Sequence, residues 1–363
     1  MDNSPELVEA VVTPLSVRRD GSFDGGVFYL NGTPVEQALH VRSQINRIHS
    51  PGILDEQLIR RLTPEERPHL YAGVLFNHFG HFLLESLGRL WAVAAAEYNI
   101  PVVFLPMWGV ADLSDPNHYM SATLAELGVS PDRIRVLTTP QRFSNLLVPP
   151  QLYGFYHMRE PDARILEFFA RAWREDELEP DPDAENSMLY VSRSRIDIRL
   201  GRIAGEQQFE AYLRTQGYEV MYPETLPFPE QIRRYRRAKR IIFCEGSAVH
   251  SAVLYRKTRA KIGVILRRHD TEGWIKRYFN ALGIDVITIN ALLRHDACGL
   301  SVHMGVSVVD YLRVSERLKR EGLVDNVFSE WISLRSEAIR SHYTAFVTRV
   351  GGEPGFFCPK IDY

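Results

Sequence analysis

The fold of the C-terminal half is decided by a stretch in which an apolar strand runs into the start of a helix: Ile241-Ile242-Phe243-Cys244-Glu245-Gly246-Ser247-Ala248-Val249-His250. Gly246 allows a ligand to approach the backbone closely, and Ser247 is predicted to cap the helix. The free N–H groups of the first turn, which includes Ala248, then point out of the carboxyl edge of the sheet, where a phosphate is stabilised. Many strand-to-helix turns carry Gly-Ser without a ligand, so this motif alone leaves both interpretations open.

Strands and helices alternate regularly on both sides of this turn. The predicted strands are 188–192, 218–221, 240–244, 261–266 and 285–289, and the predicted helices between them are 206–216, 230–238, 247–255 and 272–282. Such an alternation indicates right-handed crossovers and a parallel sheet that is covered on both faces. The C-terminal half is therefore predicted to be an α/β, Rossmann-like domain. A long helix near 327–349 follows, and its role stays open.

Arginines at a second strand end support a ligand site at the same edge. Strand 188–192 is followed directly by Arg193 and then by Arg195. A guanidinium group suits a diphosphate, because it offers several donors in a fixed plane. A solvated basic loop is the alternative, and it loses weight because both features lie at one edge of the sheet.

Three further residues near this edge have roles that the sequence leaves open. His250 either donates to a phosphate or packs against the next strand. Glu245 would be repelled by a diphosphate, so we expect it to accept hydrogen bonds from sugar hydroxyls or to cap an arginine. Phe228, in the loop after the second strand, is a candidate to cover a uracil or guanine ring.

The N-terminal half contains a polar stripe in an otherwise apolar run, residues 76–96. At helical pitch, His78, His81, Glu85 and Arg89 share one broad face of the predicted helix. Groups that are costly to bury inside an apolar surround often hold something polar, so we expect this face to line a cleft between two domains. The alternative is a buried network of His81, Glu85 and Arg89 that only fixes the helix.

Two domains are expected, at residues 1–180 and 181–363, with the last segment in a position to pack back on the first domain. The acidic, proline-bearing run 175–183 cannot enter a core and is the predicted linker; a solvated loop within one domain is the alternative. Short strands and turns are predicted up to about residue 70. Strands near 101–105, 134–137 and 145–148 and helices near 118–127 and 162–173 follow.

Composition limits the class of protein. The 43 basic and 45 acidic residues nearly balance, which argues against nucleic-acid binding over the whole surface. The cysteines Cys244, Cys298 and Cys358 are too widely spaced for a zinc site or a disulfide framework, which fits a reducing compartment. No signal peptide and no membrane-spanning segment is visible. We therefore expect a soluble, cytoplasmic protein, whose basic run 233–240 is a candidate for peripheral contact with a membrane.

Three segments together resemble glycosyltransferase family 61, many of whose bacterial members are capsular polysaccharide biosynthesis proteins. The segments are Asn77-His78-x-x-His81-Phe82-x-x-Glu85-x-x-x-Arg89, Tyr190-Val191-Ser192-Arg193 with Glu206, and residues 226–231 through Ala238 to Glu245-Gly246-Ser247-Ala248. The likeness spans about residues 70–260. It implies a GT-B-like fold with two Rossmann-like domains facing a cleft, and an inverting transfer of sugar without a catalytic metal or other cofactor. The implied partners are a nucleotide-sugar donor, with a UDP-sugar expected first, and a glycan acceptor that can be lipid-linked. In eukaryotic members a histidine precedes the Gly-Ala turn, whereas Glu245 stands here.

Inversion requires a base for the acceptor hydroxyl and positive charge for the leaving diphosphate. Glu85 is the first candidate for the base, His81 is the second, and His78 is expected to orient the acceptor. Arg193, Arg195 and the helix that starts at Ser247 are expected to hold the diphosphate. A nucleotide-sugar epimerase or a non-catalytic binder would use the same turn. A metal-dependent hydrolase is a weaker alternative, because the spacing of His78, His81 and Glu85 is not that of HExxH.

Overall fold

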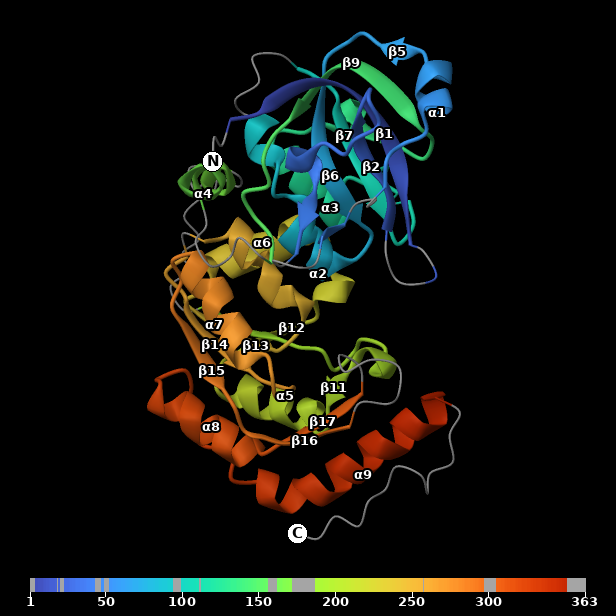
Figure 1. Cartoon of the computed structure of the whole chain (residues 1–363). Coiled ribbons are helices and arrows are strands. Elements are labelled where there is room, and N and C mark those ends of the chain that lie inside the picture. The colour runs from blue at the N-terminus through green and yellow to red at the C-terminus, as the bar shows by residue number, and fades with distance from the viewer. Residues whose placement is uncertain are drawn as a thin grey trace. The chain divides into compact units, whose positions relative to one another are not determined.

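The computed structural model describes residues 4–17, 19, 23–42, 47–48, 52–93, 99–110, 112–155, 162–171, 187–256, 258–296 and 305–350. The chain divides into two compact units, Met1–Glu177 and Leu178–Tyr363. Each unit contains its own main sheet (Figure 1). The predicted linker at 175–183 lies outside the described residues.

The N-terminal unit is built on a mixed sheet. Its strands are β1 (Glu6–Val17), β2 (Phe23–Tyr29), β5 (Pro64–Glu65), β6 (His69–Phe76), β7 (Val102–Met107), β8 (Ile134–Val136) and β9 (Gln141–Val148). The order is β2-β1-β9-β6-β7-β8, with β5 beside β9. The strands from β9 to β8 run parallel, whereas β1 is antiparallel to both of its neighbours. This sheet therefore departs from the Rossmann-like sheet predicted for this half, because the short β1–β2 connection allows an antiparallel pair.

Helices and short turns connect the strands of this unit. Outside residues 76–96, those in the described part are α1 (Glu56–Arg61), α3 (Tyr119–Glu126), α4 (Ala163–Arg171) and the 3-10 turns η1 (Glu36–Ala38) and η4 (Pro131–Arg133). Strands β3 (His40–Val41) and β4 (Arg47–Ile48) form a separate antiparallel pair.

The continuous helix predicted over residues 76–96 is wrong. Phe76 still belongs to β6, and it is followed by the turn α2 (Phe79–His81), the π-helical turn η2 (Phe82–Ser86) and the 3-10 turn η3 (Leu90–Val93). Two contacts explain the interruption. The Ser86 hydroxyl accepts a hydrogen bond from the Phe76 N–H at 3.0 Å. A Cβ on Gly88 would lie 2.3 Å from the Tyr153 carbonyl oxygen, so another chain segment passes very close to the backbone at this point.

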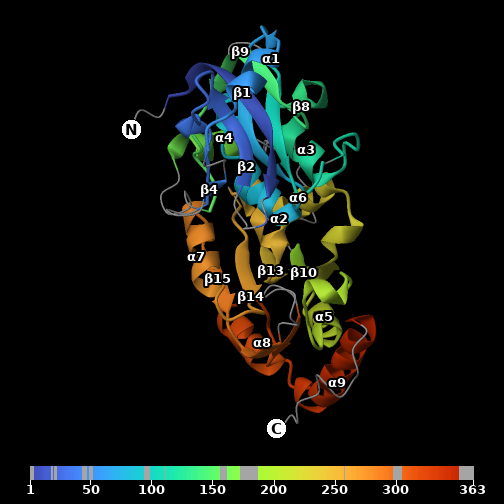
Figure 2. The same ribbon diagram turned by 45° about the vertical axis from the view of Figure 1, so that its right-hand side comes forward.

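The C-terminal unit contains a wholly parallel five-stranded sheet, as predicted. Its strands are β10 (Met188–Val191), β12 (Glu219–Met221), β13 (Arg240–Cys244), β14 (Lys261–Ile265) and β15 (Val286–Ile289), in the order β12-β10-β13-β14-β15. Figure 2 shows β15, β14, β13 and β10 following one another across the sheet. Helices α5 (Glu206–Thr215), α6 (Phe228–Arg237) and α7 (Glu272–Ala281) and the 3-10 helix η10 (Ser247–Leu254) alternate with the strands. The predicted bounds are confirmed to within two residues.

The end of the chain also belongs to this unit. A small sheet, β11-β17-β16, is formed by β11 (Arg202–Ile203), β16 (Leu292–Asp296) and β17 (Val306–Val309). The turns η8 (Ile198–Leu200) and η9 (Pro223–Thr225) and the helices α8 (Tyr311–Arg320) and α9 (Trp331–Val350) complete the described part. The ring of Trp331 covers Gly205, at which a Cβ would lie 2.4 Å from the indole. Helix α9 therefore packs within the C-terminal unit.

Candidate functional site

The polar stripe of the N-terminal unit begins where β6 ends, at the carboxyl edge of the sheet. Strands β6 and β7 are parallel neighbours, with Phe76 opposite Met107, and the Asn77 N–H donates to the Met107 carbonyl at 3.0 Å. His78 caps the turn α2, because its Nδ1 accepts from the backbone N–H of His81 at 3.5 Å. The local structure therefore places both histidines at the edge where parallel strands bind ligands.

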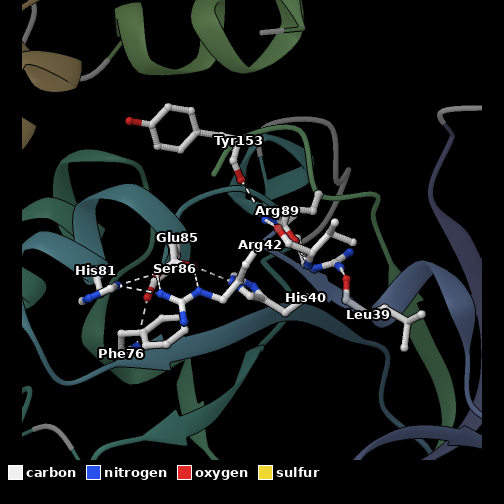
Figure 3. Close-up of polar contacts among 11 residues, drawn as sticks. Leu39, His40, Arg42, Phe76, His81, Glu85, Ser86, Arg89 and Tyr153 are labelled. Atoms are coloured by element: carbon white, nitrogen blue, oxygen red, sulfur yellow. Dashed lines mark hydrogen bonds and ion pairs between the residues drawn. The ribbon is translucent and has the colours of Figure 1, made fainter. Parts of the chain in front are cut away.

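Glu85 is the centre of a buried polar cluster, and its side chain is 1 % exposed. Its carboxylate accepts hydrogen bonds from His40 Nε2 at 3.2 Å, Arg42 Nε at 2.7 Å and His81 Nδ1 at 2.5 Å (Figure 3). Burial acts to raise the pKa of Glu85. The hydrogen bonds from His40 and His81 and the charge of Arg42 outweigh it, and the pKa falls to about 2.

His81 has the geometry of an imidazole that is oriented by a carboxylate. Because Nδ1 faces Glu85, we assign the proton of the neutral ring to Nδ1 and the lone pair to Nε2. The His81 side chain is 26 % exposed, and its Nε2 makes no hydrogen bond to any residue that the structure describes. An imidazole held in this way is able to accept a proton from a bound hydroxyl.

Arg89 does not take part in this cluster. It is buried, and it donates to the backbone carbonyls of Leu39, at 2.8 Å, and Pro149 (Figure 3). Burial lowers the pKa of Arg89 to about 10. The predicted alternative, a buried network of His81, Glu85 and Arg89, is therefore wrong in its inclusion of Arg89. This side chain instead connects the segments that contain Leu39 and Pro149.

Sequence reasoning missed His40 and Arg42, which supply two of the three partners of Glu85. They lie in and directly after the two-residue strand β3, more than forty positions before Glu85. Burial is the main cause that lowers the pKa of His40, which favours its neutral form. No spacing rule connects these positions, so only the folded chain reveals the contact.

Aromatic rings surround the two histidines. The ring centroids of His78 and His81 are 5.0 Å apart, and the indole of Trp108 is nearly perpendicular to both rings. Burial, followed by the charge of His81, lowers the pKa of His78. His78 is therefore favoured as a neutral group, one that is able to donate or accept a hydrogen bond.

The candidate anion site of the C-terminal unit lies where the strand order reverses. Strands β10 and β13 are neighbours in the sheet, but their connections leave in opposite directions through β12 and β14. Such a switch point is where open parallel sheets bind ligands. Arg193 follows β10 and Gly246 follows β13. A Cβ on Gly246 would lie 2.1 Å from Arg193 Nη1, so the two predicted residues are in close contact.

Gly246 and Ser247 have different roles from those predicted. Gly246 itself is the cap residue of η10, its φ of 176° is ordinary extended backbone, and Ser247 is the first helical residue. Gly246 is thus required by the close approach of Arg193 and not by its backbone angles. The η10 turn, which includes Ala248, still begins at the carboxyl end of β13.

The guanidinium group of Arg193 is held by backbone carbonyls. It donates to the Leu200 carbonyl at 2.9 Å and to the Gly201 carbonyl at 3.2 Å, while its own backbone N–H donates to Glu206 Oε1 at 2.8 Å. Among the described residues its side chain forms no ion pair with a carboxylate.

Glu245 is buried and faces the loop after β14. Its carboxylate accepts from the Arg267 N–H at 2.8 Å, from Arg268 Nε at 2.6 Å and from Thr271 Oγ1 at 3.0 Å. Of the two roles considered for Glu245, the structure therefore shows the capping of an arginine.

Arg267 and Arg268 were missed by sequence reasoning. Arg267 is 3 % exposed; burial, and then the charges of Arg193 and Arg268, lower its pKa to about 9. Its Nε donates to the Glu245 carbonyl at 3.0 Å. Both arginines closely follow a buried strand, as Arg193 does, and this shared position was the available signal. Arg193, Arg267 and Arg268 are called the arginine cluster below.

Three other predicted residues have different surroundings. The Arg195 guanidinium lies 3.7 Å from the centroid of the Tyr222 ring. His250 packs edge-on against Trp274 of α7, at a centroid distance of 5.0 Å, which corresponds to the packing alternative, although the neighbour is a helix and not a strand. Phe228 is the first residue of α6 and is buried, so its predicted position in a loop is wrong.

The basic run 233–240 lies mainly on α6, and part of its charge is paired. Arg233 forms an ion pair with Glu230, and Arg234 pairs with Glu219 and Glu230. In the part of the chain that the structure describes, no helix combines the length and apolar character needed to cross a membrane. Within the same residues, no three His, Cys, Asp or Glu side chains are grouped so that they could share a metal ion.

Comparison with known proteins identifies the family. The profile of the family described as Glycosyltransferase 61 matches residues 79–262, which is more than half of the chain. The match includes His81 and Glu85 of the N-terminal unit as well as Arg193 and Gly246 of the C-terminal unit. No curated protein matches the chain significantly. The extent of the family match shows that the chain belongs to glycosyltransferase family 61 and is a glycosyltransferase enzyme.

Proposed function

We propose that this glycosyltransferase inverts the anomeric carbon of a nucleotide-sugar donor in one displacement, with His81 as the base. In this step His81 Nε2 takes the proton of an acceptor hydroxyl, and the hydroxyl oxygen forms a bond to the anomeric carbon. The bond from that carbon to the diphosphate oxygen breaks, and the nucleoside diphosphate leaves with the electron pair. The contact of 2.5 Å between His81 Nδ1 and Glu85 Oε2 is the observation that carries this proposal.

This assignment prefers His81, the second candidate for the base, to Glu85, the first. A carboxylate with a pKa of about 2 binds a proton poorly near neutral pH, and its oxygens already accept from His40, Arg42 and His81. Glu85 is better suited to fix the tautomer of His81 and to stabilise the imidazolium that forms. His78, whose ring contacts that of His81, is assigned to orient the acceptor.

The arginine cluster and the first turn of η10 are assigned to the leaving diphosphate. The charges of Arg193 and Arg268 act to lower the pKa of Arg267, so a bound dianion would relieve the repulsion among these groups. Backbone N–H groups at the start of a helix add partial positive charge in the same region. Arg193 is the first candidate, because its guanidinium lies directly over Gly246.

The proposal requires the two sheet edges to face one another in the working enzyme, in the manner of a GT-B transferase. We further propose that the nucleotide is UDP, that the acceptor is a glycan and that the enzyme takes part in surface polysaccharide synthesis. It needs no catalytic metal, because the diphosphate charge is opposed by guanidinium groups.

Ligand-linked stabilisation tests the donor side. A thermal-shift series with UDP, GDP, CMP and dTDP, each with and without EDTA, is expected to show the largest rise in Tm with UDP, independent of EDTA. A rise with none of them would contradict the assigned nucleotide site.

Product analysis tests the reaction. With a UDP-sugar and glycan fragments, UDP release should depend on the acceptor, and NMR of the product should show the anomeric configuration opposite to that of the donor. Retention of configuration would overturn the single-displacement proposal, and UDP-sugar epimerisation without an acceptor would overturn the transfer reaction.

A further inference from the structure

Trp108 combines a half-exposed side chain with an unusual backbone. It directly follows β7, its side chain is 51 % exposed, and its φ is +60°. Among the described residues it is the only one other than glycine with a positive φ. A bulky residue in this region is a true outlier, and such outliers concentrate at ligand-binding sites and active sites.

The indole is fixed beside the proposed base. Its ring centroid lies 4.8 Å from that of His81 and 6.1 Å from that of His78, with interplanar angles of 80° and 81°. The centroid of the Phe76 ring lies 5.1 Å from that of the indole and 5.7 Å from that of His81. Three rings therefore hold the indole in place, although half of its surface is left to solvent.

The position of Trp108 follows from the sheet. Because β6 and β7 are parallel and adjacent, their carboxyl ends bring residues 77–81 and Trp108 to one edge. Gly109, with a φ of 103° and no side chain, and Val110, which is 59 % exposed, follow it. An apolar surface is thus left exposed at the edge that carries the proposed base.

We propose that Trp108 is the platform on which the acceptor sugar stacks, and that the acceptor is a pyranoside with one apolar C–H face. This inference rests on the proposed function, because it takes His81 as the group that receives the acceptor proton. The C–H bonds of such a face carry slight positive charge and pack favourably on the electron-rich face of an indole. Sugars with mainly equatorial substituents, such as glucose and galactose, present this face. Stacking would then orient one hydroxyl toward His81.

The stacking is tested directly by NMR of ¹⁵N-labelled full-length protein. The indole N–H signal of Trp108 is assigned from its loss in Trp108→Phe. Methyl β-glucopyranoside and methyl β-galactopyranoside are then titrated, with sorbitol as a control that has hydroxyls but no ring face. The Trp108 signal should shift with at least one pyranoside and not with sorbitol, while the other indole signals stay in place. An unchanged Trp108 signal with both pyranosides, or an equal shift with sorbitol, would overturn the inference.

Kinetics test its consequence. With the acceptor glycan found active, Trp108→Ala should raise the acceptor KM by about ten-fold or more, while UDP affinity is unchanged. Trp108→Tyr should recover most of the loss, because a ring that stacks is restored. Ile53→Ala removes an apolar side chain of the same unit that is 75 % exposed, and it should leave the acceptor KM unchanged. An acceptor KM in Trp108→Ala equal to that of the wild type would contradict the platform.

The two proposals fail in different ways. If pyranosides shift the Trp108 signal but His81→Ala retains full turnover, the platform stands and the assigned base falls. If His81→Ala abolishes turnover but Trp108→Ala transfers normally, the base stands and the platform falls.

Discussion

The candidate sites of the two units both lie at the carboxyl ends of parallel strands, but they carry different chemical groups. At the ends of β6 and β7, the N-terminal unit carries imidazoles and a carboxylate that is hydrogen-bonded to them. At the ends of β10, β13 and β14, the C-terminal unit carries guanidinium groups around a glycine. One edge is suited to moving a proton, and the other is suited to holding negative charge.

A comparison of Glu85 with Glu206 illustrates this difference. Glu85 accepts from imidazoles and a guanidinium, so its charge acts on titratable neighbours. In the C-terminal unit, Glu206 accepts from the Tyr190 hydroxyl at 2.9 Å and the Ser192 hydroxyl at 3.1 Å. Burial is the main cause that raises the pKa of Glu206. Glu206 thus binds neutral donors, whereas Glu245, at the end of β13, is paired with Arg268. Arg193 is left without a carboxylate partner in the described part of the chain.

The largest effect is expected from a substitution that impairs the N-terminal edge alone. His81→Ala should lower turnover by about two to four orders of magnitude, because it removes the proton acceptor, while the Kd for UDP stays within about two-fold. Initial rates and calorimetric titration measure the two quantities. His118→Ala, in the same unit but outside the cluster, is the matched control and should keep both. Full turnover in His81→Ala would exclude His81 as the base.

The second prediction concerns the pH dependence of stability. The pKa of Glu85 is 4.5 for an unperturbed group and about 2 in the folded protein. Because the folded pKa is the lower one, its contribution is complete above pH 4.5 and is lost as the pH falls toward 2. The difference corresponds to roughly 3 kcal/mol. Glu85→Gln should therefore be less stable than the wild type at pH 7, and the gap should narrow between pH 4.5 and pH 3.

Urea denaturation at pH 7, 4.5 and 3 measures this gap. Glu56→Gln is the control, because Glu56 pairs with Arg60 on the surface of the same unit with a side chain that is 71 % exposed. An exposed pair of this kind contributes little, about 0–1 kcal/mol. A gap for Glu85→Gln that stays constant with pH would show that Glu85 is not held with a low pKa.

The third prediction concerns a substitution that impairs the C-terminal edge alone. Arg193→Ala should weaken UDP binding by about ten- to a hundred-fold, since a charge-assisted contact contributes roughly 1.5–3 kcal/mol. Arg199→Ala is the matched control in the same loop, because Arg199 is paired with Asp197. Calorimetric titration with UDP measures both. Equal affinities of wild type and Arg193→Ala would remove Arg193 from the nucleotide site.

The smallest effect is expected at Gly246. In Gly246→Ala the new Cβ would lie 2.1 Å from Arg193 Nη1, so the guanidinium has to move. We expect UDP affinity to fall by about three- to ten-fold. Tm should change little, because a φ of 176° suits any residue. Gly273→Ala, where the nearest atom would lie 3.9 Å from the new Cβ, is the control. Unchanged UDP affinity in Gly246→Ala would show that nucleotide binding does not depend on the close contact between Gly246 and Arg193.

Sequence patterns were sufficient to predict the secondary structure where it follows from local rules. The alternation of residues 188–289 predicted each strand and helix of the parallel sheet, because burial on both faces produces continuous apolar strands. The same patterns failed at residues 76–96, where the apolar run continued through a strand end, a π-helical turn and a 3-10 turn. The apolar residues of this run indicate only that the chain is buried there. A run that is apolar on all sides has no clear period of 3.6 residues, so it does not distinguish a straight helix from another buried conformation.

The family resemblance, the parallel C-terminal sheet and part of each edge, with His81 and Glu85 in one unit and Arg193 in the other, could be predicted from the sequence alone, because they follow from local periodicity and from motifs of fixed spacing. The remaining groups, and which groups act on one another, became visible only in the folded chain. His40 and Arg42 lower the pKa of Glu85 from more than forty positions away, and Arg267 lies beside Arg193 only because strand order places β14 next to β13 and β13 next to β10. Electrostatic interactions depend on distance in space and on burial, and neither can be read from separation along the chain.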